Sequence, residues 1–326
     1  MAPVRTFARA LSDGVLVLDG GLSNQLEAQG CDLSDALWSA RLLADAPDQI
    51  EAAHTAYVRA GAQVLITSSY QATYEGFARR GLGREATTAL LSRSVSLARA
   101  AGRGAGWVAA SVGPYGAMAA DGSEYRGRYG LSVRALERFH RPRVAALAAA
   151  GPDVLALETV PDSDEAEALL RAVAGCGVPV WLSYTVAGGR TRAGQDLAEA
   201  FAVAAGNDQV VAVGVNCCDP AEVADAVAAA VAVTGKPGVA YPNSGEQWAP
   251  DPGAWRGPAA FGPTEAPGLA ATWTTAGARL VGGCCRVGPA TIAAIAAVEG
   301  QGEQGEGEGG REGGGAEGAG REGLGI

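Results

Sequence analysis

The sequence predicts a (β/α)8 TIM-like barrel, because eight short apolar runs alternate with longer helical segments along most of the chain. The runs are rich in Val, Ile and Leu and apolar throughout, as is typical of parallel strands that are buried on both faces. Each run ends in a polar or glycine-rich motif, and barrels of this class carry their functional groups at the C-terminal ends of the strands. An open, doubly wound sheet is the alternative.

The expected strands are, in chain order, Val15–Asp19, Gln63–Ser69, Gly106–Val112, Asp153–Thr159, Val178–Tyr184, Val210–Cys217, Gly238–Tyr241 and Arg279–Cys284. The expected helices are Pro47–Ala60, Arg84–Gly102, Leu131–Ala150, Asp162–Ala174, Leu197–Ala205, Pro220–Val233 and Pro289–Val298. Three of these helices begin with proline, which suits a first turn, and Asp219 is a candidate N-cap before Pro220. Residues 1–298 are therefore predicted to form one barrel domain.

Residues 299–326 form a Gly/Glu-rich C-terminal tail that is expected to be disordered. From Gly300 to Ile326 there are 13 glycines and almost no apolar side chains. Such a segment cannot bury enough surface to offset the entropy lost on ordering. Half of the net charge of −10 lies in this tail, so the barrel itself is only mildly acidic.

Composition and charge also exclude several classes of partner. No basic patch suggests nucleic acid. No apolar run reaches the roughly 18 residues that cross a bilayer, and no signal peptide is evident, so no membrane partner and a cytoplasmic location are expected. In that compartment the six cysteines are more readily explained as metal ligands or buried thiols than as disulfides. A monomer is the default expectation, because no long dimerisation arm is evident.

Three cysteines at the ends of two predicted strands are the most informative feature of the chain. One is in Gly214-Val215-Asn216-Cys217, and the other two are adjacent in Gly282-Gly283-Cys284-Cys285. Adjacent cysteines rarely pair with each other, because disulfide geometry is demanding. Three thiolates that converge from strand ends instead predict a zinc site whose fourth position is open, which is the catalytic arrangement. On the residues alone, Cys218 competes with Cys217 as the first ligand.

Two carboxylates also stand at strand ends. Asp19 precedes Gly20 and Gly21, and Glu158 closes the fourth run. A carboxylate buried without a partner is costly, so two of them at one mouth are suited to hold an ammonium group. The backbone amides of Gly20 and Gly21 allow an anion such as a carboxylate to approach.

The two histidines, His54 and His140, fall inside predicted helices and away from strand ends. Structural roles are favoured for both. Without a candidate imidazole base or ligand, a Ser-His-Asp hydrolase and a His-ligated metallohydrolase are disfavoured.

These motifs together resemble the homocysteine S-methyltransferase family. The resemblance covers nearly all of residues 13–298. It rests on Asp19-Gly20-Gly21-Leu22, Thr67-Ser68-Ser69-Tyr70-Gln71-Ala72, Ser111-Val112-Gly113-Pro114-Tyr115-Gly116, Leu157-Glu158-Thr159-Val160-Pro161, Gly214-Val215-Asn216-Cys217 and Gly282-Gly283-Cys284-Cys285-Arg286. The Gly-x-Asn-Cys motif combined with Gly-Gly-Cys-Cys is the specific part.

The resemblance implies a zinc enzyme built on a (β/α)8 barrel. It places the metal ligands at Cys217, Cys284 and Cys285. It also implies that Asp19 and Glu158 hold the amino group of homocysteine, while the backbone amides of Gly20 and Gly21 hold its carboxylate. Zinc deprotonates a bound thiol, and only the thiolate is a good nucleophile, so the bottom-up chemistry agrees with methyl transfer to sulfur.

With its Ser69-Tyr70-Gln71-Ala72 motif the chain most resembles the S-methylmethionine-dependent branch of the family. The resemblance therefore implies S-methylmethionine, or S-adenosylmethionine, as the methyl donor. A sulfonium leaves as a neutral thioether, and no cobalamin module is evident. Betaine as the donor, a selenol as the acceptor, and a non-catalytic zinc- or thiol-binding barrel are the alternatives. Four aromatic residues are candidates to line a site for a cationic donor, namely Tyr70, Tyr115, Tyr184 and Trp248.

Overall fold

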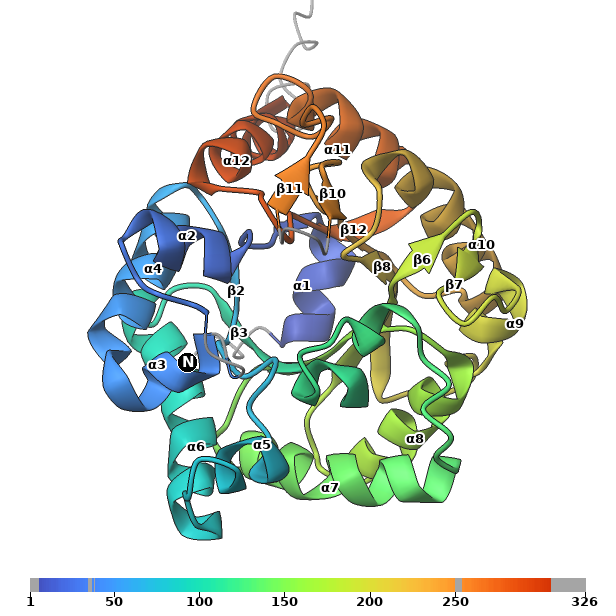
Figure 1. Ribbon diagram of the computed structural model, residues 1–326. Coiled ribbons are helices and arrows are strands. Elements are labelled where there is room, and N and C mark those ends of the chain that lie inside the picture. The colour runs from blue at the N-terminus through green and yellow to red at the C-terminus, as the bar shows by residue number, and fades with distance from the viewer. Residues whose placement is uncertain (1–5, 35–36, 38, 250–253, 306–326) are drawn as a thin grey trace, which may run out of the picture.

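Eight parallel strands close into a barrel in the computed structural model, which describes residues 6–34, 37, 39–249 and 254–305 (Figure 1). The sheet order is β1-β12-β9-β8-β5-β4-β3-β2, and a parallel bridge between Leu18 and Val64 joins β1 to β2. The strands are β1 (Leu16–Val17), β2 (Val64–Ile66), β3 (Trp107–Val112), β4 (Val154–Val160), β5 (Val180–Tyr184), β8 (Val210–Asn216), β9 (Gly238–Tyr241) and β12 (Ala278–Val281). The barrel prediction is therefore confirmed, and the open sheet is excluded.

Eight helices surround the barrel. They are α4 (Pro47–Arg59), α6 (Arg84–Ala101), α7 (Val133–Ala149), α8 (Ser163–Val173), α9 (Leu197–Ala202), α10 (Val223–Thr234), α11 (Ala266–Thr275) and α12 (Pro289–Gly305). Seven of them match predicted helices with shifted ends. The eighth, α11, was not predicted, because its Ala, Gly and Thr content gives little amphipathic pattern.

Helix α12 includes the first seven residues of the tail that was predicted to be disordered. It continues to Gly305, so the predicted boundary at residue 298 falls inside a helix. The remainder of the predicted tail, residues 306–326, lies outside the described residues.

Shorter elements lie before β1 and in the connections between the barrel strands and helices. Four short helices were not predicted: α1 (Phe7–Asp13), α2 (Leu22–Ala28), α3 (Ser39–Asp45) and α5 (Tyr74–Ala78). Two 3-10 turns, η1 (Tyr115–Met118) and η2 (Ser123–Tyr125), lie in the connection from β3 to α7, and a third, η3 (Pro220–Glu222), precedes α10. Two hairpins complete the set, β6 (Val186–Ala187) with β7 (Arg190–Thr191), and β10 (Gln247–Ala249) with β11 (Ala254–Arg256).

Helix α1 closes the N-terminal end of the barrel. Thr6 caps it by accepting a hydrogen bond from the Arg9 amide at 3.3 Å, and Phe7 and Leu11 are buried on its inner face. The Phe7 ring lies 5.5 Å from the Trp107 ring and 6.4 Å from the Trp181 ring, measured between centroids. Because one end is plugged by this apolar cluster, ligands have to enter from the other end, where the strands finish.

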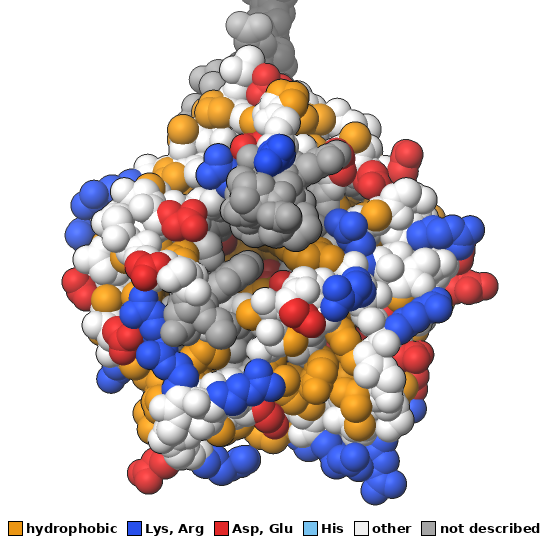
Figure 2. Space-filling model, viewed as in Figure 1, with side chains coloured by type: hydrophobic (Ala, Val, Ile, Leu, Met, Phe, Trp, Pro, Cys, Tyr) orange, Lys and Arg blue, Asp and Glu red, His pale blue; other side chains and the backbone are white. Residues whose placement is uncertain are grey.

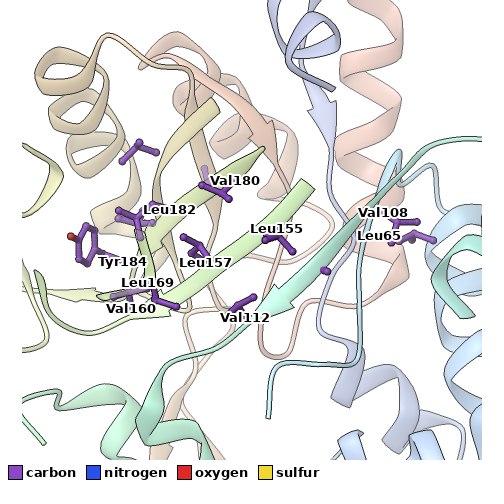
Figure 3. Close-up of a cluster of buried hydrophobic side chains, with 14 of the residues drawn as sticks. Leu65, Val108, Val112, Leu155, Leu157, Val160, Leu169, Val180, Leu182 and Tyr184 are labelled. Carbon is purple, nitrogen blue, oxygen red and sulfur yellow. The ribbon is translucent and has the colours of Figure 1, made fainter. Parts of the chain in front are cut away.

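Alternation along the strands separates two apolar layers. Val154 and Ala156 belong to the cluster inside the barrel, whereas Leu155 and Leu157 belong to the larger cluster beneath the helices. Figure 3 shows part of this outer layer, with side chains of β3, β4 and β5 close together. Both layers exclude water, so the strands are mostly apolar on both faces, and polar residues such as Glu158 and Asn216 gather toward their C-terminal ends.

The open face of the barrel carries charges of both signs. Figure 2 shows acidic and basic side chains interspersed around its rim. Within the described part of the chain, no helix combines the length and the apolar character needed to cross a membrane.

We expect His54 in α4 to make the fold acid-sensitive. The residue is fully buried, and neither ring nitrogen has a hydrogen-bond partner within the described structure. Burial lowers the pKa of His54 to about 4, against about 6.5 in the unfolded chain. As pH falls from about 6.5 to about 4, the unfolded state takes up a proton before the folded state does, so about 3 kcal/mol of stability is lost.

Urea unfolding of the wild type and of His54→Leu between pH 4 and pH 8 measures this effect. The leucine variant should lose less free energy of unfolding over the acidic window, and all shared titrations cancel in the difference. If the free energy of unfolding changed with pH in the same way in both proteins, the expectation would be contradicted.

Candidate metal and substrate site

Three cysteine sulfurs meet at the open end of the barrel. The Sγ atoms of Cys217, Cys284 and Cys285 all lie within 4.8 Å of one another, and that of Cys217 is 3.8 Å from that of Cys285. Cys218 instead packs in the outer apolar layer and is absent from this cluster. Position 217 is thus the one that faces the other two thiols.

The convergence depends on the strand between the two cysteine segments. Cys217 follows β8 and Cys284 follows β12, and β9 separates these strands in the sheet. The end of β9 receives hydrogen bonds from both sides: the Cys217 amide donates to the Tyr241 carbonyl at 3.2 Å, and the Cys284 amide donates to the Pro242 carbonyl at 2.7 Å. Both cysteine loops are therefore drawn toward one point above β9.

The three thiols fit a zinc ion. Tetrahedral coordination with zinc–sulfur bonds of about 2.3 Å separates the sulfurs by about 3.8 Å, which is the observed distance between Cys217 and Cys285. Hydrogen bonds with the other two thiols, followed by burial, raise the pKa of Cys284 well above its ordinary value. Three thiols this close together cannot all ionise without a cation, and thiolate ligands favour a divalent metal such as zinc.

Asn216 in the Gly-x-Asn-Cys motif has a role that the sequence did not reveal. Its Oδ1 atom accepts a hydrogen bond from the Thr159 amide at 2.7 Å, and its Nδ2 donates to Thr159 Oγ1 at 2.8 Å. Thr159 has a φ of 57°, which is costly for a β-branched residue. The Asn216 side chain therefore holds the strained backbone beside Glu158.

Asp19 and Glu158 differ in position and in their partners: Glu158 is among the residues that line the cavity at this end of the barrel, and Asp19 is not. Asp19 Oδ2 accepts a hydrogen bond from the Ile66 amide at 2.9 Å, while its Oδ1 is buried without a partner in the described structure. Glu158 accepts hydrogen bonds from the Ser111 hydroxyl and, at 3.0 Å, from the Tyr241 hydroxyl. The two carboxylates are close enough for their charges to interact.

Burial dominates the electrostatics of these acids. It raises the pKa of Glu158 to about 7 and that of Asp19 well above its ordinary value. An incoming cation would reverse this shift, because an opposite charge favours the ionised carboxylate. The pair is therefore suited to an ammonium group.

Gly20 and Gly21 serve first to let two chain segments approach closely. A Cβ atom on Gly20 would lie 2.8 Å from the Tyr57 ring, and one on Gly21 would lie 2.6 Å from the Cys284 carbonyl oxygen. The Gly21 amide already donates to the Val287 carbonyl at 2.9 Å. Of the two amides, only that of Gly20 lacks a hydrogen-bond partner in the described part of the chain.

One cavity joins these groups. Its lining includes Gly20, Gly21, Tyr70, Gln71, Glu124, Tyr125, Glu158, Cys217, Tyr241, Cys284 and Cys285.

The aromatic residues around this cavity differ from those predicted. Tyr70 lines it, but Tyr184 is buried and donates to the Ala200 carbonyl at 2.8 Å, and Tyr115 packs on Phe139. The side chain of Trp248 lies outside the described residues. Tyr125 was missed, although its hydroxyl donates to Cys217 Sγ at 3.8 Å.

Glu124, beside Tyr125, was missed as well. Both stand in Asp121-Gly122-Ser123-Glu124-Tyr125, a polar loop without periodicity. The only signal in the sequence was the position of this loop after a predicted strand.

Comparison with known proteins agrees with this site. Residues 16–298 match the homocysteine S-methyltransferase family. The chain belongs to this family. It is 45% identical to homocysteine S-methyltransferase 4 of Zea mays, covering 90% of this chain and 91% of that protein, and 45% identical to the homocysteine S-methyltransferase of Escherichia coli, covering 89% and 97%.

A solved structure supports the same relationship. The metallated form of the Escherichia coli homocysteine methyltransferase MmuM superposes with a TM-score of 0.78 at 45% identity, covering 89% of this chain and 98% of that chain. A methyltransferase from Methanosarcina mazei, with a TM-score of 0.59 at 12% identity, shares the fold. The family and the barrel inferred from the sequence are both confirmed.

We expect Gly283→Ala to weaken metal binding. A Cβ atom there would overlap the side chain of Val287, which is fully buried. The strand end would have to shift, and with it Cys284. Zinc affinity should fall about tenfold or more, as it does when groups that position ligands are lost.

Competition with a chromophoric chelator measures that affinity. Gly268→Ala is the control, because Gly268 is exposed in α11 and a Cβ atom there contacts nothing within 4 Å. An unchanged zinc affinity in Gly283→Ala would show that the strand end adapts without moving the thiol.

Proposed function

We propose that this protein transfers a methyl group from S-methylmethionine to the sulfur of L-homocysteine. The methyl carbon leaves the sulfonium, whose bonding electrons remain on the donor sulfur, and it bonds to the homocysteine sulfur, which releases its proton. Two molecules of methionine result. The observation that carries the proposal is the cluster of three cysteine sulfurs, of which that of Cys217 is buried, together with two buried carboxylates, Asp19 and Glu158, in a member of this family.

Cys217, Cys284 and Cys285 would hold a zinc ion, which supplies the positive charge that keeps a fourth, incoming thiol ionised at neutral pH. The sulfur cluster lies beneath Tyr125, whose hydroxyl hydrogen-bonds Cys217 and helps to orient that ligand. The metallated state of the Escherichia coli MmuM structure supports this assignment.

The acceptor would be oriented by its amino-acid end. The unpartnered Oδ1 atom of Asp19 and the carboxylate of Glu158 would accept hydrogen bonds from its ammonium group. Gly20 and Gly21 are the proposed contacts of its carboxylate, with the free Gly20 amide as the donor. When the ammonium and carboxylate groups are both held, the thiol at the other end of homocysteine is the group that reaches the cysteines.

A sulfonium donor is favoured because it is a good leaving group and approaches an anionic site favourably, and the resemblance of the Ser69-Tyr70-Gln71-Ala72 motif to the S-methylmethionine-dependent branch favours S-methylmethionine. S-adenosylmethionine offers the same sulfonium and is the next candidate. We assign the activity to the barrel domain, which was predicted as residues 1–298 and whose last helix, α12, continues to Gly305. A cytoplasmic enzyme that acts as a monomer remains our expectation.

Zinc-loaded, reduced protein should form methionine from homocysteine and S-methylmethionine, with two methionines for each homocysteine consumed. A strong chelator should abolish the product, and added zinc should restore it. With S-adenosylmethionine, each homocysteine would give only one methionine, so the ratio identifies the donor.

Cys284→Ser should lose both zinc and activity in the same assay. A zinc-free but active Cys284→Ser protein would contradict the proposal. Tight zinc without methionine from any sulfonium donor would favour a non-catalytic binding barrel instead.

A further inference from the structure

Two buried carboxylates line the cavity, and the second of them, Glu124, has no assigned role. Glu124 lies in η2, between β3 and α7, and is only 4% exposed. Its Oε2 atom has no hydrogen-bond partner within the described part of the chain. It lines the same cavity as the three cysteines.

The position of Glu124 is fixed by its own loop. Asp121 Oδ1 accepts a hydrogen bond from the Ser123 amide at 2.9 Å, and Ser123 Oγ donates to the Gly116 carbonyl at 3.3 Å. Gly116 lies so close that a Cβ atom there would overlap the Glu124 amide. The loop therefore fixes the backbone that carries Glu124. Burial disfavours the charged form of a carboxylate that lacks a full set of hydrogen-bond partners, and the nearby cation, Arg126, is exposed to solvent.

The surroundings of Glu124 show which kind of ligand suits it. Its carboxylate is close enough for its charge to interact with Cys217, Cys285 and Tyr70. Tyr70 and Tyr125 line the cavity with it. A carboxylate and two aromatic side chains together favour a cation, including one that cannot donate hydrogen bonds.

We propose that Glu124 binds the sulfonium group of the methyl donor. The inference rests on the proposed function. In methyl transfer the acceptor sulfur, the methyl carbon and the donor sulfur lie in line, so the sulfonium has to sit just beyond the sulfur cluster. Asp19 and Glu158 are assigned to the acceptor, which leaves Glu124 as the buried carboxylate that faces the cysteines from another element.

The charge on the donor sulfur exists only before transfer. The methyl carbon breaks its bond to that sulfur, which keeps the electron pair and becomes a neutral thioether, and the acceptor sulfur gives its lone pair to the methyl carbon. Glu124 therefore stabilises the bound donor and not the thioether product. Loss of its charge should raise the KM for the donor without lowering kcat, because the interaction weakens as the transition state forms.

Glu124→Gln removes the charge and keeps the shape. The KM for S-methylmethionine should rise about 10–100-fold, the range expected for loss of a buried charge pair. The KM for homocysteine should stay within about twofold. Calorimetry should show weaker binding of S-methylmethionine and unchanged binding of methionine, which has the same amino-acid end without the sulfonium.

Two further variants serve as controls. Asp19→Asn should raise the KM for homocysteine and leave the KM for S-methylmethionine nearly unchanged. Glu124→Asp keeps the charge on a shorter side chain and should recover part of the donor affinity. Thermal unfolding confirms that each variant is folded.

Three outcomes would overturn the inference. A raised homocysteine KM in Glu124→Gln would place Glu124 with the acceptor. Equal weakening of S-methylmethionine and methionine would show that Glu124 binds the amino group, and unchanged constants would remove it from binding altogether. If the wild type makes no methionine, the proposed function fails, but calorimetry with S-methylmethionine still tests Glu124: loss of binding in the variant supports it, and no binding by the wild type contradicts it.

Discussion

The hydrogen bonds at the end of β9 are the constraint on which the site depends. Two loops, one after β8 and one after β12, carry the thiols, and neither would reach the other across an intervening strand without being drawn inward. The Tyr241 and Pro242 carbonyls accept hydrogen bonds from Cys217 and Cys284, so β9 acts as the template for both. Tyr241 also donates its hydroxyl hydrogen to Glu158, which ties the carboxylate that is proposed to bind substrate to the same strand.

Close packing between β1 and β12 forms the second half of the site. The glycines after both strands allow backbones to approach where a Cβ atom would overlap a neighbour. Asp19 thereby stands beside the cysteine loop, and its backbone carbonyl accepts a hydrogen bond from the Gly283 amide at 3.1 Å. Gly20 and Gly21, which the sequence suggested as an anion site, are required for this close contact between the ends of β1 and β12. Of their two amides, that of Gly20 is left free for a ligand within the described structure.

Local patterns predicted much of this protein. Eight apolar runs predicted the barrel, and their polar ends predicted where Asp19, Glu158 and the three cysteines would gather. Long-range contacts were not accessible in this way. Asn216 stabilises the left-handed backbone of Thr159 across 57 positions of sequence, and Glu124 reaches the cavity from a loop that has no periodicity. The residues alone also left Cys217 and Cys218 open, because neighbouring side chains diverge at a strand end. The family resemblance pointed to Cys217, and in the fold the Cys217 thiol joins the cluster while Cys218 packs in the outer apolar layer.

The proposed chemistry requires that three cysteines hold zinc with one position kept for the substrate sulfur. X-ray absorption at the zinc edge, recorded with and without homocysteine, tests it most directly. We expect three sulfur ligands and one light-atom ligand in the resting protein, and four sulfur ligands after homocysteine is added. Four sulfur ligands before homocysteine is added, or a zinc environment that homocysteine leaves unchanged, would contradict it.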